Sequence, residues 1–317
     1  MQKIRKLLEN RMFIQILPIV FLLILILFFS LATERFASKA TFKVILDAAL
    51  PVGVVATGAC FIFATGNVNL AMGATTVLTA TLAGMAYNAT ESLLVMIIVA
   101  ILLGMGLMAV SAVLSTLFQV RVLFVTIVMM TLLSAIQQSI LGGTTVSLPY
   151  ALVDSLTKNY FAYYVFAFFF LACVVLFHFS NIGRSLKMLG TNDVNAEQTG
   201  IRKSIFLLIA FIIAGIGCGC GALVFLVRSG SVGTKTLPSL NMDCMLAIVL
   251  GGMSVFGGSK SFVYSGIVGA ITVCVLNTGL QMIGVDSTII QAVRGALFLL
   301  LIMTAQQRPK GLPAPEG

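Results

Sequence analysis

The chain has 317 residues, of which 59% are hydrophobic and 9% are charged, and its formal net charge is +9. A soluble domain carries about 25% charged residues, so this chain cannot cover a water-facing surface, and lipid is its main solvent. The basic residues lie in short gaps between apolar runs, as the positive-inside rule describes, which argues against a nucleic-acid partner. The composition therefore predicts an all-α integral membrane protein.

Apolar segments that are suitable for crossing a bilayer follow one another along the chain. A crossing helix needs about 20 apolar residues. The first run is longer than the apolar core of a signal peptide and no Ala-x-Ala-like site follows it, so we interpret it as a retained span. We expect one polytopic bundle over 1–317, of about ten transmembrane helices with short broken or re-entrant segments: 12–32, 44–65, 68–87, 92–114, 122–141, 160–179, 205–227, 242–257, 262–283 and 287–304.

The distribution of basic residues predicts the orientation of the chain in its membrane. If the N-terminus is cytoplasmic, twelve basic residues lie inside and six lie outside, with Arg294 within a span. Three of the six outer basic residues lie close together in the sequence and count against this orientation, namely Arg35, Lys39 and Lys43. The cytoplasmic parts are then an N-terminus (1–11), a loop (180–204) and a tail (305–317), and the longest outer loop is 142–159.

The cytoplasmic loop contains the longest strongly polar insert of the chain, GRSLKMLGTNDVNAEQTGI at 183–201. A short helix is expected within it, because Asn192 or Asp193 can cap a first turn and Ala196 and Glu197 favour helix. Gly200 is suited to end that helix. Such an insert in a membrane protein indicates contact with a soluble partner.

Two glycine-rich stretches separate predicted spans and resemble each other. They are GNVNLAMG at 66–73 and GGMSVFGG at 251–258. Glycine allows backbone excursions that a regular helix forbids, and such excursions at membrane depth lie against protein or a water-filled cavity. The stretches are therefore candidate gates or pathway elements, through Gly66, Gly73, Gly251, Gly252, Gly257 and Gly258, or else ordinary tight turns.

Amide side chains in or near the spans are candidates for contact with a neutral polar solute. Polar groups are costly in lipid and should face the bundle interior, where hydrogen bonding between helices is the alternative role. Arg294 lies near enough to a helix end to be interpreted as a snorkelling side chain. The candidate pathway residues are Asn67, Asn69, Asn277, Gln281 and Gln291.

No residue pattern points to catalysis, to a metal or to a nucleotide site. The six cysteines lie in apolar stretches and are interpreted as buried apolar side chains. Lys260 and Ser261 follow the second glycine-rich stretch, but Ser259 stands where a Walker A motif requires glycine, and the flanks are helical rather than strand. We expect no cofactor on this chain, and if the protein uses ATP, with its Mg²⁺, a partner subunit binds it.

Four segments together carry a resemblance to a known family. The first stretch keeps Gly66, Leu70 and Gly73 of the pattern GGIDLSVG, with Asn67 for glycine and Asn69 for aspartate. The chain thus resembles the permease subunits of bacterial ATP-binding-cassette importers for simple sugars of the ribose, xylose and galactose type. The other three segments match at Gly183, Arg184, Gly190, Asn192, Ala196, Gly200 and Ile201; at Asp243, Ala247, Leu250, Gly251, Gly252, Ser254, Gly257 and Gly258; and at Leu276, Asn277, Gly279, Leu280, Gly284, Val285, Gln291 and Gly295.

The resemblance implies a function and a set of partners. The cytoplasmic insert would form a coupling helix that docks in a groove of an ATPase subunit. The further partners implied are a second permease copy or sister permease and an extracytoplasmic solute-binding protein. Asn69 and Asn241 replace two acids of the family pattern, which leaves a nucleoside or a branched-chain amino acid open as the solute. A stand-alone secondary carrier and a non-transporting scaffold are the remaining alternatives.

Overall fold

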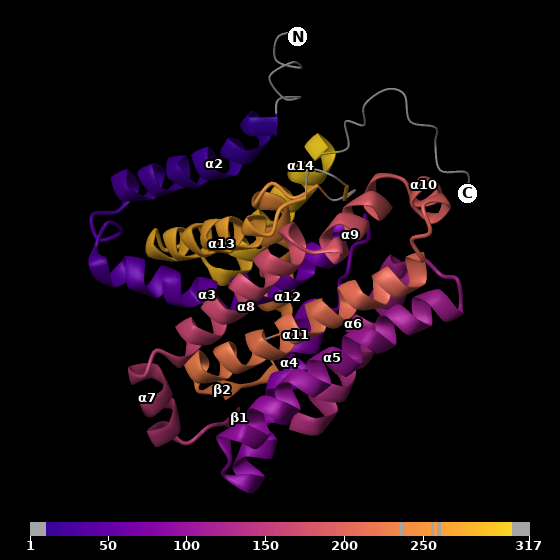
Figure 1. Cartoon of the computed structure of the whole chain (residues 1–317). Helices are drawn as coiled ribbons and strands as arrows, with labels where there is room; N and C mark the ends of the chain where they lie inside the picture. The colour runs from indigo at the N-terminus through magenta and orange to yellow at the C-terminus, as the bar shows by residue number, and fades with distance from the viewer. Residues whose placement is uncertain (1–10, 235–236, 255–256, 259–260, 306–317) are drawn as a thin grey trace.

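The computed structural model describes residues 11–234, 237–254, 257–258 and 261–305. These residues fold into a helical bundle with one short pair of strands (Figure 1). The helices are α2 (Arg11–Ala32), α3 (Lys39–Ala64), α4 (Met72–Thr90), α5 (Leu93–Leu117), α6 (Val122–Leu141), α7 (Tyr150–Lys158), α8 (Phe161–His178), α9 (Asn181–Thr191), α10 (Asp193–Gln198), α11 (Lys203–Ser229), α12 (Leu237–Leu250), α13 (Tyr264–Met282) and α14 (Ser287–Ala305).

Each predicted span overlaps a helix, although 242–257 extends past the end of α12 at Leu250, and not every helix is long and apolar enough to cross a membrane. Among the described residues six helices are, namely α3, α5, α6, α8, α11 and α13. Shorter apolar segments occur in α2, α12 and α14. Helix α4 is continuous, but threonines interrupt its run of apolar residues. Four of them are buried, namely Thr75, Thr76, Thr79 and Thr81. The all-helical membrane class is therefore confirmed, whereas the count of ten spans is not.

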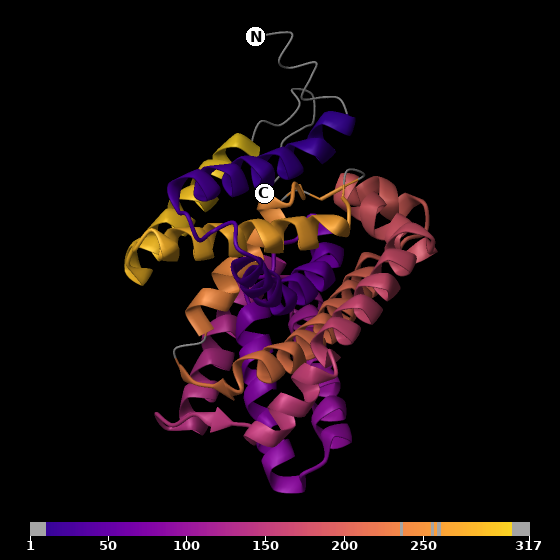
Figure 2. The same cartoon turned by 90° about the vertical axis from the view of Figure 1, so that its left-hand side faces the viewer.

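Two helices form the centre of the bundle and others surround them. In α3 and α11, 83% and 78% of the most apolar stretch is buried, compared with 22% or less in α5, α6 and α8. Side chains of the outer helices point into the surroundings, for example Leu102, Val128 and Phe168. Figure 2 shows α2 lying along α13 at one edge of the bundle. Lipid or further chains must cover these outer faces, because water cannot.

Small residues let the central helices approach closely, as the G-x-x-x-G spacing in 215–221 predicts. A Cβ atom on Gly104 of α5 would lie 2.5 Å from the carbonyl oxygen of Gly215 on α11. On its other face α11 meets α3, where a Cβ atom on Gly58 would lie 3.3 Å from the Cα atom of Gly217. Any larger side chain would separate these helices, so the glycines set the spacing of the core.

The segment expected as the longest outer loop, 142–159, has secondary structure of its own. Strand β1 (Val146–Ser147) pairs antiparallel with β2 (Ser231–Val232), with Val146 opposite Val232. The amphipathic helix α7 follows β1 directly. The segment connects α6 to α8, as predicted, but the sequence analysis identified neither element in it, because the pairing partner of β1 is distant in sequence and gives no local signal. Figure 1 places α7, β1 and β2 at the end of the bundle opposite α9 and α10.

Candidate coupling and translocation sites

The polar insert, expected as a loop over 180–204, consists mainly of two helices. Helix α9 begins after Ser180, whose Oγ atom accepts a hydrogen bond from the Ile182 N–H at 3.1 Å. Helix α10 begins after Asn192, whose Oδ1 atom accepts from the Asn195 N–H at 3.1 Å. The segment still connects two membrane helices, but the sequence analysis did not identify α9, which buries Leu186 and Leu189 against the bundle at a helical spacing. The short helix predicted from Asn192 onwards is confirmed.

Helix α10 ends as the sequence predicts, at Gly200. This glycine has a φ of 84°, its N–H donates to the Glu197 carbonyl at 2.9 Å, and the Ile201 N–H donates to the Ala196 carbonyl at 3.2 Å. The pair of bonds is a Schellman motif, which requires the left-handed backbone that glycine adopts without strain. A six-residue helix is unstable by itself, so these caps are what hold α10 in shape.

The two sides of α10 differ sharply in exposure. Ala196 is 1% exposed and faces the protein, whereas Val194 is 63% exposed among polar neighbours that include Glu197. Asp193 forms an ion pair with Lys203 at the start of α11, which ties α10 to a central helix. The sequence analysis did not single out Val194, although an isolated apolar residue in a polar insert was a usable signal. Its outward position gives α10 an apolar contact point for a partner.

Helix α9 is fixed to the end of α8 by a glycine and a cation. Gly183 lies so close to the carbonyl group of Phe177 that a Cβ atom there would overlap it. The Lys187 ammonium lies over the Phe177 ring, 4.4 Å from its centroid. Arg184, in contrast, is exposed and free to meet another molecule. The start of α9 is therefore packed directly on the end of the membrane helix α8.

The second contact of α9 is with both glycine-rich stretches at once, at a place we name the glycine junction (Gly66, Gly190, Gly257 and Gly258 around the Ala64 carbonyl). A Cβ atom on Gly190 would overlap the Ala64 carbonyl oxygen and would lie 2.6 Å from the Gly258 nitrogen. The Gly258 N–H donates to the same Ala64 oxygen at 3.1 Å. A Cβ atom on Gly257 would clash with the Gly66 nitrogen. The sequence predicted these glycines separately, and the structure brings them together.

Both glycine-rich stretches connect helices rather than interrupt one. The first joins α3 to α4, and the described part of the second follows α12. Gly251 packs against the Ser265 carbonyl of α13, and Gly252 has a φ of 84° in the turn after α12. Val255, Phe256, Ser259 and Lys260 lie outside the described residues. The described backbone of both stretches is therefore that of connections between helices, as in the tight-turn alternative. The contact between the two stretches at the glycine junction is an additional feature.

The start of α4 is held by the two asparagines that replace acids of the family pattern. The buried Asn69 accepts the Ala71 N–H at 2.8 Å and donates to the Met108 sulfur at 3.3 Å. Asn241 of α12 accepts the Gly73 N–H at 3.1 Å, and a Cβ atom on Gly73 would lie 2.6 Å from the Asn241 Cα atom. Both amides therefore satisfy a helix N-terminus as an acid would, but without its charge.

A buried ion pair joins the three C-terminal helices. Arg294 of α14 lies 3.1 Å from Asp243 of α12, and their side chains are only 8% and 13% exposed. Asn277 of α13 links the two, because it donates to Asp243 at 3.2 Å and accepts from Arg294 at 2.7 Å. The interpretation of Arg294 as a snorkelling side chain was wrong, since its charge is paired inside the bundle. We name this set the Asp–Asn–Arg cluster.

The remaining predicted pathway residues lie apart from one another. Gln281 and Gln291 are exposed, so neither faces the bundle interior with its helix neighbours Asn277 and Arg294. Asn67 is half-buried and donates to the Thr65 hydroxyl at 2.9 Å. All six cysteines are free and buried, as their apolar surroundings predicted.

These features define a class of protein: a multi-pass helical protein of the inner membrane with a capped, outward-facing helix at one end. The chain belongs to the family described as the permease component of branched-chain amino acid transport systems, which matches residues 42–303. It is a membrane-spanning permease subunit of an ATP-binding-cassette importer, in agreement with the resemblance carried by its motifs.

Several curated permeases are similar over most of the chain. The ribose import permease protein RbsC of Escherichia coli K12 is 24% identical over 302 residues, covering 90% of this chain and 92% of its own length. The autoinducer 2 import permease LsrD of Yersinia pseudotuberculosis is 26% identical and covers 88% and 86%. LsrC of Yersinia enterocolitica is 27% identical and covers 73% and 65%. No solved structure matches the chain.

Proposed function

We propose that α10 is the coupling helix through which an ATPase subunit drives this permease. The observation that carries the proposal is the continuous path from Val194 to the glycine junction. Helix α10 is capped at both ends, α9 is fixed to α8 at Gly183, and Gly190 rests on the Ala64 carbonyl with no side chain between them. Motion of α10 would therefore reach both glycine-rich stretches together, because close-packed interiors transmit displacement.

The complete transporter would contain several further chains. We infer two ATPase domains that bind ATP and Mg²⁺, a second copy of this chain or a sister permease, and an extracytoplasmic binding protein that delivers the solute. Helices α2, α4, α12 and α14 would add four crossings to the six apolar spans. Both termini and α10 would then lie in the cytoplasm, and α7 outside, as the distribution of basic residues favours.

The solute is proposed to be a simple sugar or a sugar-like polar molecule. The relatives RbsC and LsrD are named for ribose and for autoinducer 2. The amides of Asn69 and Asn241 are occupied in holding the start of α4, and they leave that helix start without the negative charges of the family pattern, which is compatible with a neutral solute. A binding assay with the binding protein of the same transporter tests this. A sugar that binds there supports the proposal, and exclusive binding of a branched-chain amino acid or nucleoside contradicts it.

Coupling is tested by co-purification of the ATPase subunit with the tagged permease. Val194→Ser removes the exposed apolar contact and should lower the amount of bound ATPase about tenfold, as loss of a central interface residue does. Ala196→Pro should abolish binding, because proline removes the N–H that donates to Asn192 and disrupts α10.

The matched control is Val44→Ser, a change of the same exposed residue type at the other end of the bundle. It should leave ATPase binding unchanged, and all three variants should still insert in the membrane. Normal co-purification of the Val194→Ser and Ala196→Pro variants would exclude α10 as the coupling helix.

A further inference from the structure

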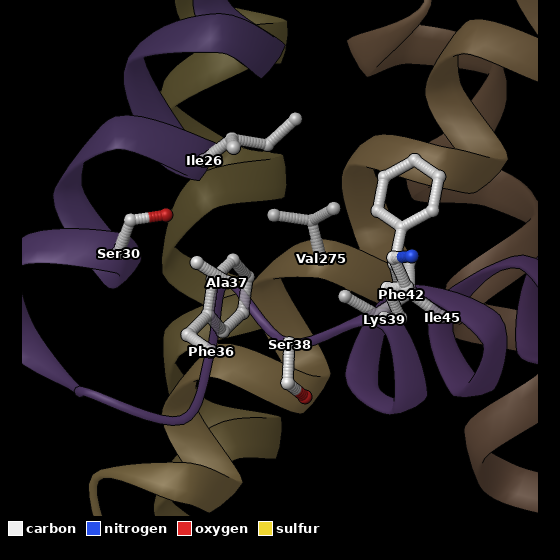
Figure 3. Close-up of a pocket in the computed structure, with 9 residues that line it drawn as sticks. All are labelled: Ile26, Ser30, Phe36, Ala37, Ser38, Lys39, Phe42, Ile45 and Val275. Atoms are coloured by element: carbon white, nitrogen blue, oxygen red, sulfur yellow. The ribbon is translucent and has the colours of Figure 1, made fainter.

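A cavity of about 400 Å³ lies between α2, the segment that follows it, α3 and α13. Figure 3 shows Ile26 and Ser30 on α2, Val275 on α13, and Phe42 and Ile45 on α3 around one common space. Its walls are apolar apart from Ser30, Ser38 and Lys39. Helix α2 packs on α13 at the edge of the bundle and exposes Leu27 and Leu31, so the cavity is placed where lipid reaches it.

Three basic residues and one acid, Glu34, lie in or beside the segment that lines the cavity, so its local net charge is positive. Lys39 lines it, and Lys43 lies one turn further on the same helix face. The backbone of Arg35 lies against the first turn of α3, where its carbonyl accepts from the Thr41 hydroxyl at 3.1 Å. All three side chains are exposed, and none belongs to the ion pairs found within the described residues. Ser38 caps α3 there, so the positive end of the helix dipole adds to the charge.

These are the three residues that run against the inside-positive bias of the chain. Basic residues at that position are unfavourable for orientation unless they have another role. An apolar cavity with Lys39 in its wall and further basic residues nearby in the chain fits an amphiphile with an acyl chain and an anionic head group.

We propose that this cavity binds an anionic phospholipid of the surrounding bilayer. The acyl chain lies between α2 and α3 against Phe42, Ile45 and Val275, and the phosphate lies at Lys39 and the start of α3. The lipid fills the space that α2 leaves open and offsets the charges of Arg35, Lys39 and Lys43. The proposal concerns the fold of this chain and does not rest on the solute or on the coupling helix.

The test uses the full chain, reconstituted in vesicles of equal parts phosphatidylglycerol and phosphatidylethanolamine and then transferred to detergent. Native mass spectrometry counts the lipids that stay bound. Phosphatidylglycerol should be retained in preference to phosphatidylethanolamine. Lys39→Ala should lower that retention about fivefold, and Ala at Arg35, Lys39 and Lys43 together about a hundredfold, as the contribution of each basic residue near an anionic lipid implies.

Two further variants fill the groove from different walls, so that failure of one to fold does not spoil the test. Ser30→Phe and Ala37→Phe should each prevent retention of phosphatidylglycerol, whereas Arg121→Ala removes an exposed basic residue before α6 and should change nothing. Equal retention of the two lipids, or unchanged retention in the triple variant, would overturn the proposal. So would a change of oligomeric state in the groove variants at constant bound lipid, because the groove would then hold a second copy of the chain.

Discussion

The Asp–Asn–Arg cluster is the main electrostatic feature at the residue scale. A charge in a membrane-embedded bundle is costly unless it is paired and hydrogen-bonded, and Asn277 supplies the hydrogen bonds that Asp243 and Arg294 need besides each other. The cluster joins one residue from each of α12, α13 and α14. It therefore fixes how the last helices of the chain are arranged on either side of the second glycine-rich stretch.

Breaking this cluster should destabilise the protein more than removing it. Arg294→Met or Asp243→Leu leaves one buried charge unpaired and should cost about 3–5 kcal/mol of stability. The double variant should recover at least half of that loss, since an apolar pair replaces both charges. Unfolding in detergent by a chemical denaturant measures each value.

Gln291→Leu is the control, because Gln291 is exposed on the same helix. It should change stability by less than about 0.5 kcal/mol. Additive losses in the double variant would show that Asp243 and Arg294 do not act as a pair.

At the scale of elements, the glycine junction joins three parts of the chain that lie far apart in sequence. The end of α3, the start of the first glycine-rich stretch, the end of α9 and Gly258 all meet at the Ala64 carbonyl. Backbone contacts without side chains are short and stiff, so a displacement of α9 cannot be absorbed by rotamer changes. The junction is therefore the expected point at which coupling fails when packing is altered.

Gly190→Ala should uncouple ATP hydrolysis from transport. The added methyl group would overlap the Ala64 oxygen, and overpacking of this kind costs about 1–3 kcal/mol. We expect solute uptake by the reconstituted transporter to fall at least about tenfold while bound ATPase stays normal, because α10 is unchanged.

The matched control is Gly106→Ala in α5, where a Cβ atom would meet nothing within 4 Å. That change should leave uptake intact and stabilise the helix by up to about 1 kcal/mol. Equal uptake in the two variants would contradict a role of the glycine junction in coupling.

At the scale of the whole molecule, the two ends of the bundle carry different elements. One end holds α9 and α10, and the other holds α7 and the β1–β2 pair (Figure 1). Helix α8 connects the two ends and is apolar enough to cross the membrane. The proposed orientation places α10 in the cytoplasm and α7 outside.

Cysteine labelling tests this orientation without removing native residues, because all six native cysteines are buried. A membrane-impermeant maleimide should label Thr157→Cys in α7 of intact cells. Asn195→Cys in α10 should be labelled only after the cells are permeabilised. Both positions are exposed on the protein surface, so a difference in labelling reports the side of the membrane and not burial within the protein. The reverse pattern would invert the topology and would move the proposed coupling helix outside.

The sequence by itself determined what depends on neighbours along the chain. The apolar runs predicted every membrane helix approximately, and Asn192, Ala196 and Gly200 predicted α10 with both of its caps. Local hydrogen bonds and the length of apolar runs are short-range properties, so they can be read from consecutive residues.

Only the tertiary structure decided which distant residues meet. It paired Arg294 with Asp243, placed Gly190 on the Ala64 carbonyl and set β1 against β2. It also revealed the cavity beside Lys39. The proposed lipid in that cavity would explain why basic residues lie there against the inside-positive bias. Such contacts depend on how helices cross and how closely they approach, and that is fixed by the packing of the whole bundle rather than by any local pattern.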